Sequence, residues 1–162
     1  MRTTDTHIYF YNSWMSNWTP NNLEIIYKDL LFTNSEQLFM WFKADYFKDY
    51  STRDKIAVLG FSPRTAKELG REVKNYNDNK WKEVRENYMY LACLAKFESD
   101  EDLKNKLLAT DNKILVEASP IDRIWGIGLA EYDDKVLDEN QWLGLNLLGK
   151  TLMKVRNELK NK

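Results

Sequence analysis

Apolar positions along the chain follow short helical and strand-like patterns. The segment 38–47 is apolar on nearly every face, which is typical of a helix that is buried all round. Residues 148–159 carry one apolar stripe and predict an amphipathic helix near the C-terminus. Short β-branched or aromatic segments predict strands at 7–11, 23–27, 30–32 and 114–116. The pattern therefore predicts a mainly α fold with a few short β-strands, of the α+β class.

Capping signals predict where two of the helices begin. Thr33 and Glu36 have capping-box spacing, in which each side chain satisfies the backbone N–H of the other residue. Ser62-Pro63 predicts a second start, with serine as the N-cap and proline at the first helical position. Gly70 is expected to end or loosen this second helix.

The longest predicted helix covers about residues 79–97, with Asp78 as its expected cap. Cys93 lies in this helix and is expected to be a small core residue, because nothing near it would activate a thiolate. Ser99 is expected to head the following helix, and Asn146 to cap the C-terminal one. The apolar stripe of the long helix is expected to comprise Trp81, Val84, Arg85, Tyr88, Ala92 and Ala95.

The composition of the chain argues against several classes of function. The chain has 162 residues, a net charge of −1, one cysteine and one histidine. This length predicts a single domain over residues 1–162, and the near-neutral charge gives no overall attraction to nucleic acid or anionic membrane. Few cysteines and histidines argue against a disulfide framework, a metal cluster or a histidine-based triad. With no signal pattern or membrane-length apolar run, we expect a cytoplasmic protein.

The stretch that follows the strand at 114–116 is rich in groups suited to a site. Carboxylates, an indole and bare backbone are what a pocket needs to hold a polar, planar, phosphate-bearing molecule. The alternative is a turn with a buried tryptophan and two conformational glycines. The residues in question are Glu117, Asp122, Trp125, Gly126 and Gly128.

Charged residues on two predicted helices are further candidates. Lys43 lies in the apolar helix, where an ammonium must reach water, a carboxylate or a ligand. Glu36 precedes it by seven positions and shares its helical face, about two turns away. Lys67 and Arg71 are four apart on another helix and suit a phosphate. The alternatives are a cap glutamate, a snorkelling lysine and a solvated basic edge.

These motifs occur in an order that resembles the YbiA-like family, also called NADAR domains, from about Phe10 to Leu159. The chain departs from the family pattern at Gln37, where many members have histidine, so a histidine role there does not carry over. The matching motifs are Ser35-Glu36-Gln37 with Lys43-Ala44, Ala66–Arg71, Trp81 with Arg85, Lys96-Phe97, Leu115–Pro120 with Asp122, Trp125–Gly128, and Trp142 followed by Asn146–Lys150, Met153 and Arg156.

The resemblance implies a compact, helix-rich N-glycosidase that cuts a bond between ribose C1′ and nitrogen. Substrates of the family are phosphorylated ribosylamine intermediates of riboflavin synthesis and ADP-ribose attached to guanine. The partner would therefore be a small phosphorylated ribosyl or ADP-ribosyl substrate, or ADP-ribosylated guanine in nucleic acid. No metal, cofactor or membrane is implied, and the sequence does not determine the oligomeric state. A non-catalytic module that binds ADP-ribose or NAD is the alternative function.

The resemblance also assigns roles to the candidate residues. Cleavage through an oxocarbenium-like state needs negative charge near C1′ and a proton for the leaving nitrogen. The catalytic candidates are Glu36, Lys43 and Asp122, which are expected to meet in one cleft. Lys43 is a general acid or a nucleophile that forms an imine with the opened sugar. Substrate-binding candidates are Lys67 and Arg71 for phosphate, Trp81 and Trp125 for stacking, and Glu117, Gly126 and Gly128 around them.

Overall fold

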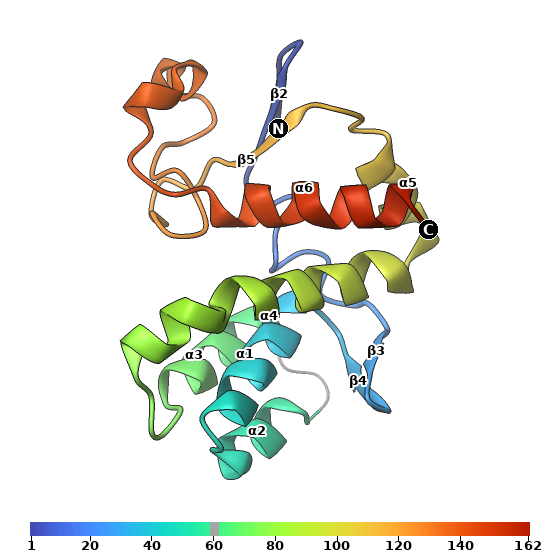
Figure 1. Ribbon diagram of the computed structural model, residues 1–162, viewed down its shortest axis with the longest axis vertical. Coiled ribbons are helices and arrows are strands. Elements are labelled where there is room, and N and C mark those ends of the chain that lie inside the picture. Colours follow the sequence, from blue (N-terminus) through green and yellow to red (C-terminus); the bar gives the residue numbers. More distant parts are fainter. Residues whose placement is uncertain (59–61) are drawn as a thin grey trace. The chain divides into compact units, whose positions relative to one another are not determined.

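The structure is a computed structural model that describes residues 1–58 and 62–162. These residues form two compact units, one from residues 1–16 and 103–162, the other from residues 17–102. Helices dominate and the strands are short, so the predicted mainly α class is confirmed (Figure 1). The single domain expected over residues 1–162 stays a prediction.

The first unit is built on a three-stranded sheet with the order β1-β2-β5. β1 (Arg2–Thr3) pairs antiparallel with β2 (His7–Phe10), and β2 pairs parallel with β5 (Ile114–Glu117). A parallel pair needs a long crossover, and here the intervening chain includes the whole second unit. The strands predicted at 7–11 and 114–116 are confirmed.

Helix α6 (Leu147–Lys160) packs against β5, and Figure 1 shows it running beside that strand. Its predicted stripe is confirmed, since Leu148, Leu152, Val155 and Leu159 are all buried. The other helix of this unit is α5 (Glu101–Leu108). The core of the unit comprises Tyr9, Val116, Ala118, Ile127, Leu129 and Val136.

Asn146 occupies the N-cap position of α6 but does not cap the helix with its side chain. Its Oδ1 accepts the Glu117 N–H at 3.0 Å, and its Nδ2 donates to the Leu115 carbonyl oxygen at 3.0 Å. The amide thus satisfies the backbone of β5, as a neighbouring strand would. The capping role expected for Asn146 is therefore wrong, because the side chain is used by the sheet.

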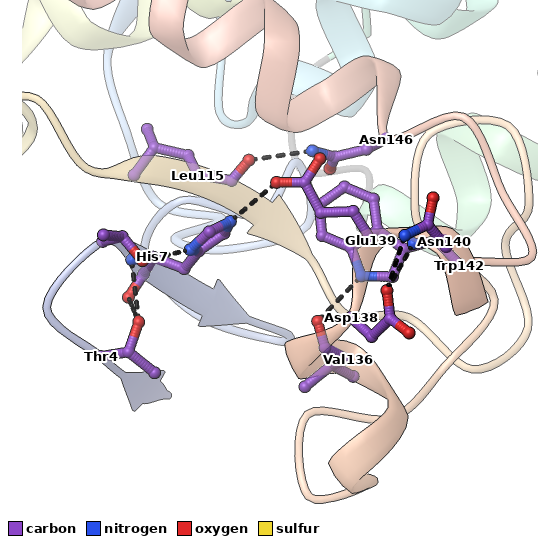
Figure 2. A network of polar contacts seen from close by, with 10 residues as sticks. Thr4, His7, Leu115, Val136, Asp138, Glu139, Asn140, Trp142 and Asn146 are labelled. Atoms are coloured by element: carbon purple, nitrogen blue, oxygen red, sulfur yellow. Dashed lines mark hydrogen bonds and ion pairs between the residues drawn. The ribbon is translucent and has the colours of Figure 1, made fainter.

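Polar contacts connect β2 with the short 3₁₀ helices η1 (Asp134–Leu137) and η2 (Glu139–Gln141) (Figure 2). His7 Nε2 lies 3.1 Å from Glu139 Oε1, and Trp142 Nε1 donates to the Val136 carbonyl oxygen at 2.9 Å. The imidazole also stacks on the Tyr9 ring with 5.5 Å between centroids. The one histidine of the chain is therefore part of the packing of this segment.

The second unit begins with a hairpin of β3 (Ile25–Tyr27) and β4 (Leu30–Phe32). Lys28 and Asp29 form its turn with φ of 47° and 63°. Positive φ at both central residues is the type I′ geometry that matches the twist of paired strands. The strands predicted at 23–27 and 30–32 are confirmed, and the structure pairs them as a hairpin.

Four helices complete the second unit: α1 (Ser35–Tyr46), α2 (Tyr50–Ile56), α3 (Pro63–Arg71) and α4 (Asp78–Ser99). α1 packs against the other three, which explains why it is apolar on nearly all faces (Figure 1). The predicted start of α3 is confirmed, since Ser62 Oγ accepts the Thr65 N–H at 3.2 Å. Gly70 lies inside α3, which continues to Arg71, so the expectation that it ends the helix is wrong.

The bounds of α4 differ from the prediction at both ends. Asn77 is the N-cap in place of Asp78, and its Oδ1 accepts the Lys80 N–H at 3.0 Å. Ser99 is the last residue of α4, and α5 starts at Glu101. The buried face is also rotated from the predicted stripe, because the position of α1 decides which side is covered. It comprises Trp81, Met89, Ala92, Cys93, Lys96 and Phe97, whereas Val84, Arg85, Tyr88 and Ala95 are half-buried.

Cys93 is fully enclosed in α4, and burial raises the pKa of its thiol to about 12. It is the small core residue that the sequence predicted. Among the helices of the described residues, none is both long and apolar enough to cross a bilayer.

Candidate active site

The first turn of α1 positions Glu36. Asn34, not Thr33, is the N-cap, and its Oδ1 accepts the Gln37 N–H at 2.8 Å. The Thr33 N–H, which the predicted capping box would direct to Glu36, donates to Gln37 Oε1 at 2.9 Å. The predicted box is therefore displaced by one residue. Gln37 therefore accepts the hydrogen bond that the sequence assigned to Glu36. Glu36 itself is buried.

Gln37, the residue that departs from the family pattern, has hydrogen-bond partners at both ends of its side-chain amide. Its Nε2 donates to the Ile56 carbonyl oxygen at 2.8 Å, while its Oε1 serves the cap. Both ends of the amide are thus used to join the start of α1 to the end of α2. Its contacts are structural ones.

Lys43 lies on the same face of α1 as Glu36, seven residues later. Its Nζ is 4.5 Å from the centroid of the Tyr76 ring, a cation–π distance. Burial lowers the pKa of Lys43, the charge of Glu36 raises it, and the charges of Lys67 and Arg71 lower it further. The four side chains therefore share one electrostatic environment within the second unit.

Helix packing explains why Lys67 and Arg71 act on Lys43. Gly70 faces Met40 of α1, and the missing side chain lets α3 approach α1 closely. Lys67 and Arg71 are three positions before and one after Gly70, and Met40 is three positions before Lys43. Residues three positions apart lie near one another on a helix, so the contact brings Lys67 of α3 toward the ammonium of Lys43. Arg71 directly follows Gly70 and lies on the next part of the helix surface, and its charge also lowers the pKa of Lys43.

Trp81 is part of an aromatic cluster in the second unit, where its exposed fraction is 7%. Its ring lies 5.4 Å from Phe39 and 5.9 Å from Tyr88, and it is nearly parallel to the latter with an interplanar angle of 14°. Tyr46 and Phe47 also contact it. These contacts favour the core role that the sequence left open beside the stacking role.

Glu117 closes β5 and is buried in the first unit. Its Oε2 accepts a hydrogen bond from Ser16 Oγ at 3.4 Å. Its backbone N–H is satisfied by Asn146, and its carbonyl oxygen accepts the Ile127 N–H at 3.0 Å. These bonds hold the residue at the base of the loop that follows.

Asp122 organises the next turn. Its Oδ1 accepts the N–H groups of Ile124 and Trp125, both at 2.8 Å. The side chain is half-buried, as is the indole of Trp125. One carboxylate oxygen of Asp122 thus has a structural role in the turn.

The two glycines of this loop have different physical roles. Gly126 is buried, and a β-carbon there would lie 2.9 Å from the carbonyl oxygens of both Asp122 and Glu117. Gly128 has a φ of 71°, in the left-handed region that favours glycine. The N–H groups of Ile127 and Gly128 donate to the carbonyl oxygens of Glu117 and Asp122, at 3.0 and 3.1 Å. Backbone N–H groups of residues 127 and 128 therefore serve the loop itself.

The predicted site residues thus fall into two groups, one in each unit. The second unit brings together Glu36, Lys43, Lys67 and Arg71, with Trp81 in the adjoining aromatic cluster. The first unit gathers Glu117, Asp122, Trp125, Gly126 and Gly128 in one loop. That Asp122 meets Glu36 and Lys43 stays a prediction.

The sequence reading missed two aromatic residues beside these cations. Tyr76 contacts Lys43 as given above, and the Trp18 ring centroid lies 5.9 Å from Lys67 Nζ. Tyr76 lies between α3 and α4 and offers no periodic signal. Trp18 belongs to the loop of residues 12–18, which we call the aromatic loop. Its content of aromatic and amide side chains was the one sequence feature that could have indicated a site there.

A cavity of about 550 Å³ in the second unit lies on another side of α1. Trp41 contributes to its wall and is five residues from Glu36, which places it about 140° around the helix. Arg53 in the wall already donates to Asp45 at 2.9 Å and to Asp54 at 3.0 Å. The charge of Arg53 is therefore matched by these two carboxylates. The lining comprises Lys28, Leu30, Trp41, Asp45, Arg53, Asp54, Ala57 and Val58.

Metal-binding side chains do not gather in the part of the chain that the structure describes, where no three His, Cys, Asp or Glu residues form a cluster suited to an ion. The chemistry available to the described residues is that of carboxylates, ammonium and guanidinium groups, and aromatic rings.

The chain is similar to known proteins over nearly its whole length. A family model described as the NADAR domain matches residues 1–160. The chain is 36% identical to N-glycosidase R617 of Acanthamoeba polyphaga mimivirus, over 96% of this chain and 97% of that protein. It is 38% identical to Protein irg-1 of Caenorhabditis elegans, over 93% of this chain and 74% of that protein. The NMR structure of the E. coli protein YbiA is similar, with a TM-score of 0.76 and 30% identity over 99% of this chain and 88% of that one.

Proposed function

The chain belongs to the NADAR domain family, and from this premise we propose that this N-glycosidase acts on a ribosyl substrate that carries phosphate. The reaction is hydrolysis of the bond between ribose C1′ and a nitrogen. Water supplies a hydroxyl group to C1′, and the leaving nitrogen gains a proton. The proposed setting is the cytoplasm.

The observation that carries this proposal is the charge around Lys43. The charges of Lys67 and Arg71 both act on the ammonium of Lys43, as does the opposite charge of Glu36. Burial lowers the pKa of Lys43 most, and the like charges of Lys67 and Arg71 lower it further, which costs free energy unless an anion compensates. A phosphate bound by Lys67 and Arg71 would supply that anion.

Glu36 and Lys43 are the proposed chemical groups of this unit. A carboxylate beside C1′ stabilises the positive charge that develops on the sugar, or activates the attacking water. The depressed pKa of Lys43 suits it to give a proton to the leaving nitrogen, or to attack C1′ as a neutral amine and form an imine. Both roles need the side chain close to C1′.

The loop of the first unit supplies the remaining candidates. Asp122 is proposed to place the ribose hydroxyls, through the carboxylate oxygen that the turn does not use. Trp125 is the proposed stacking surface of this loop, and Glu117, Gly126 and Gly128 hold it in shape. Trp81 supports the aromatic cluster beneath Lys43.

A non-catalytic ADP-ribose or NAD-binding module was the alternative. The N-glycosidase relative that aligns along nearly its whole length favours the enzyme. Within the enzyme class, the common chemistry is a ribosyl C1′–N bond with a phosphate attached to the ribose. A phosphorylated ribosylamine intermediate of riboflavin synthesis and ADP-ribosylated guanine both contain it.

The test is a direct assay of both substrates, with the released sugar and base identified by mass spectrometry. We expect wild-type protein to release a free base or amine and a phosphorylated ribose or ADP-ribose from at least one of them. Glu36→Gln and Lys43→Ala should each lower turnover by about a hundredfold or more while melting temperature stays nearly unchanged. Lys154→Gln, on the exposed face of α6, is the matched control and should keep full turnover.

Failure to cleave either substrate would contradict the proposed chemistry. The same assay with EDTA tests the expectation that no metal is required. Loss of turnover in EDTA that a divalent ion restores would refute the metal-free mechanism and leave the substrate assignment intact.

A further inference from the structure

The chain segment that ends the aromatic loop is fixed directly beside Glu36. The carbonyl oxygen of Asn17 accepts the Glu36 N–H at 3.3 Å and the Ser35 hydroxyl at 3.3 Å. The Ser35 hydroxyl also lies 3.1 Å from Asn17 Oδ1. Asn17 is buried, so these bonds hold its backbone against the first turn of α1. The next residue, Trp18, therefore leaves from a fixed point next to the backbone of Glu36.

Trp18 differs from the other tryptophans of the chain in exposure. Its exposed fraction is 36%, whereas the other five are buried or half-buried. An indole exposes a large flat apolar surface, and its π-face accepts planar rings and cations. A large aromatic side chain on a rigid anchor has lost little additional freedom when a ligand stacks on it.

The Trp18 ring lies close to Lys67, one of the two proposed phosphate-binding residues. Its Nζ lies 5.9 Å from the Trp18 ring centroid, near the outer limit of a cation–π contact. The cation lies over the ring, and the exposed 36% of the side chain is the part that a ligand can contact. Trp18 is therefore close to two residues of the proposed site, to Glu36 through the backbone of Asn17 and to Lys67 through its own ring.

We propose that Trp18 is the stacking platform for the planar leaving group of the substrate, a purine or pyrimidine-like ring. This inference rests on the proposed function and adds a residue that determines specificity. In this proposal Lys67 binds the phosphate, Glu36 faces the sugar, and the exposed part of the Trp18 ring covers the leaving group. A substrate whose leaving group is not planar would lose this contact.

The first experiment measures steady-state kinetics of Trp18→Leu and Trp18→Phe on the substrate that wild-type protein cleaves. Loss of base stacking on an aromatic side chain corresponds to an affinity loss of about tenfold to a hundredfold. We expect KM to rise by that factor in Trp18→Leu with kcat much less affected, and Trp18→Phe to recover most of the affinity. Tyr50→Leu is the matched control, since Tyr50 is also an exposed aromatic residue beside a cation, with Arg53 Cζ 4.6 Å from its ring.

The second experiment separates the base from the sugar phosphate. Guanosine 5′-phosphate and ribose 5-phosphate are titrated into the Glu36→Gln variant by calorimetry, with and without Trp18→Leu. We expect Trp18→Leu to weaken binding of the nucleotide and to leave binding of ribose 5-phosphate unchanged. Equal weakening of both ligands would show that Trp18 contacts the sugar phosphate and would overturn the stacking role.

The two hypotheses fail separately. If wild-type protein cleaves its substrate but Trp18→Leu has an unchanged KM, the inference about Trp18 is wrong and the proposed function stands. If wild-type protein cleaves neither substrate, the proposed function is wrong whatever the nucleotide titration shows. An unfolded Trp18→Leu variant is recognised by its melting curve, and the kinetics and both titrations are then made with Trp18→Gln, for which the same results are expected.

Discussion

Gly70 of α3 faces Met40 of α1 with no room for a side chain between them. A β-carbon at position 70 would overlap the sulfur of Met40 and lie 2.9 Å from its Cγ. In an ordinary helix, replacing glycine by alanine stabilises the helix by about 1 kcal/mol, because alanine has less backbone freedom to lose. Here we expect the sign to be reversed, because the buried side chain of Met40 must leave its position to make room for the added atom.

Gly70→Ala should therefore destabilise the protein by about 1–3 kcal/mol, measured by urea unfolding. It should also raise KM, because Lys67 and Arg71 lie on either side of position 70. Met40→Ala in the same chain removes the overlapping atoms, so the double variant should be more stable than the sum of the single changes allows. A Gly70→Ala protein that is more stable than wild type would contradict this packing.

The pH dependence of turnover should report the surroundings of Lys43. The pKa of this ammonium is lowered by burial and by Lys67 and Arg71, and it is raised by Glu36. Lys67→Gln or Arg71→Gln should move the limb of the pH–rate profile that belongs to Lys43 to higher pH. Glu36→Gln should move it to lower pH, whichever protonation state is active. Shifts in the same direction for the two kinds of variant would exclude Lys43 as the titrating group.

Lys67 and Arg71 should act on binding more than on chemistry. Their proposed partner is a phosphate away from C1′, so Lys67→Ala and Arg71→Ala should raise KM with a smaller effect on kcat. Steady-state kinetics on the cleaved substrate measures both constants. A collapse of kcat at constant KM would place these residues at the reacting centre.

Asp122 stabilises a turn, and two substitutions separate this structural role from its proposed role in catalysis. Asp122→Asn keeps an oxygen for the Ile124 and Trp125 N–H groups, so the melting temperature should change little. Asp122→Ala removes both bonds and should cost about 1–3 kcal/mol of stability. If Asp122 is catalytic, the asparagine variant should lose about a hundredfold in turnover. Full turnover of Asp122→Asn would leave the residue with its turn role alone.

The role of Asn146 should require an amide side chain, which both donates and accepts a hydrogen bond. Asn146→Asp would replace the Nδ2 donor to the Leu115 carbonyl oxygen with a second oxygen, in a buried position. We expect a loss of about 1–3 kcal/mol in the free energy of unfolding, with a larger loss as pH rises through the carboxyl pKa. Asn87→Asp on the exposed face of α4 is the control. Equal stability of the two variants would contradict the role of Asn146 as a backbone partner of β5.

The sequence by itself determined the parts of this protein that depend on short-range signals. The Ser62-Pro63 start of α3, the strands β3 and β4 and the apolar stripe of α6 were all predicted correctly. Caps, turns and helical stripes depend on interactions between residues a few positions apart, so a short stretch of sequence is enough to predict them. Order of motifs along the whole chain was enough to indicate the family.

Tertiary structure decided which of several locally acceptable residues was used, and which groups met. Thr33 and Asn34 both suit an N-cap, and the bond of Gln37 to the end of α2 favours the arrangement with Asn34. Asn146 suits a cap but serves β5, because α6 lies against that strand. The nearness of Trp18 to Lys67 depends on packing between segments far apart in sequence. Such contacts have no local pattern, because they follow from which surfaces of the folded elements are pressed together.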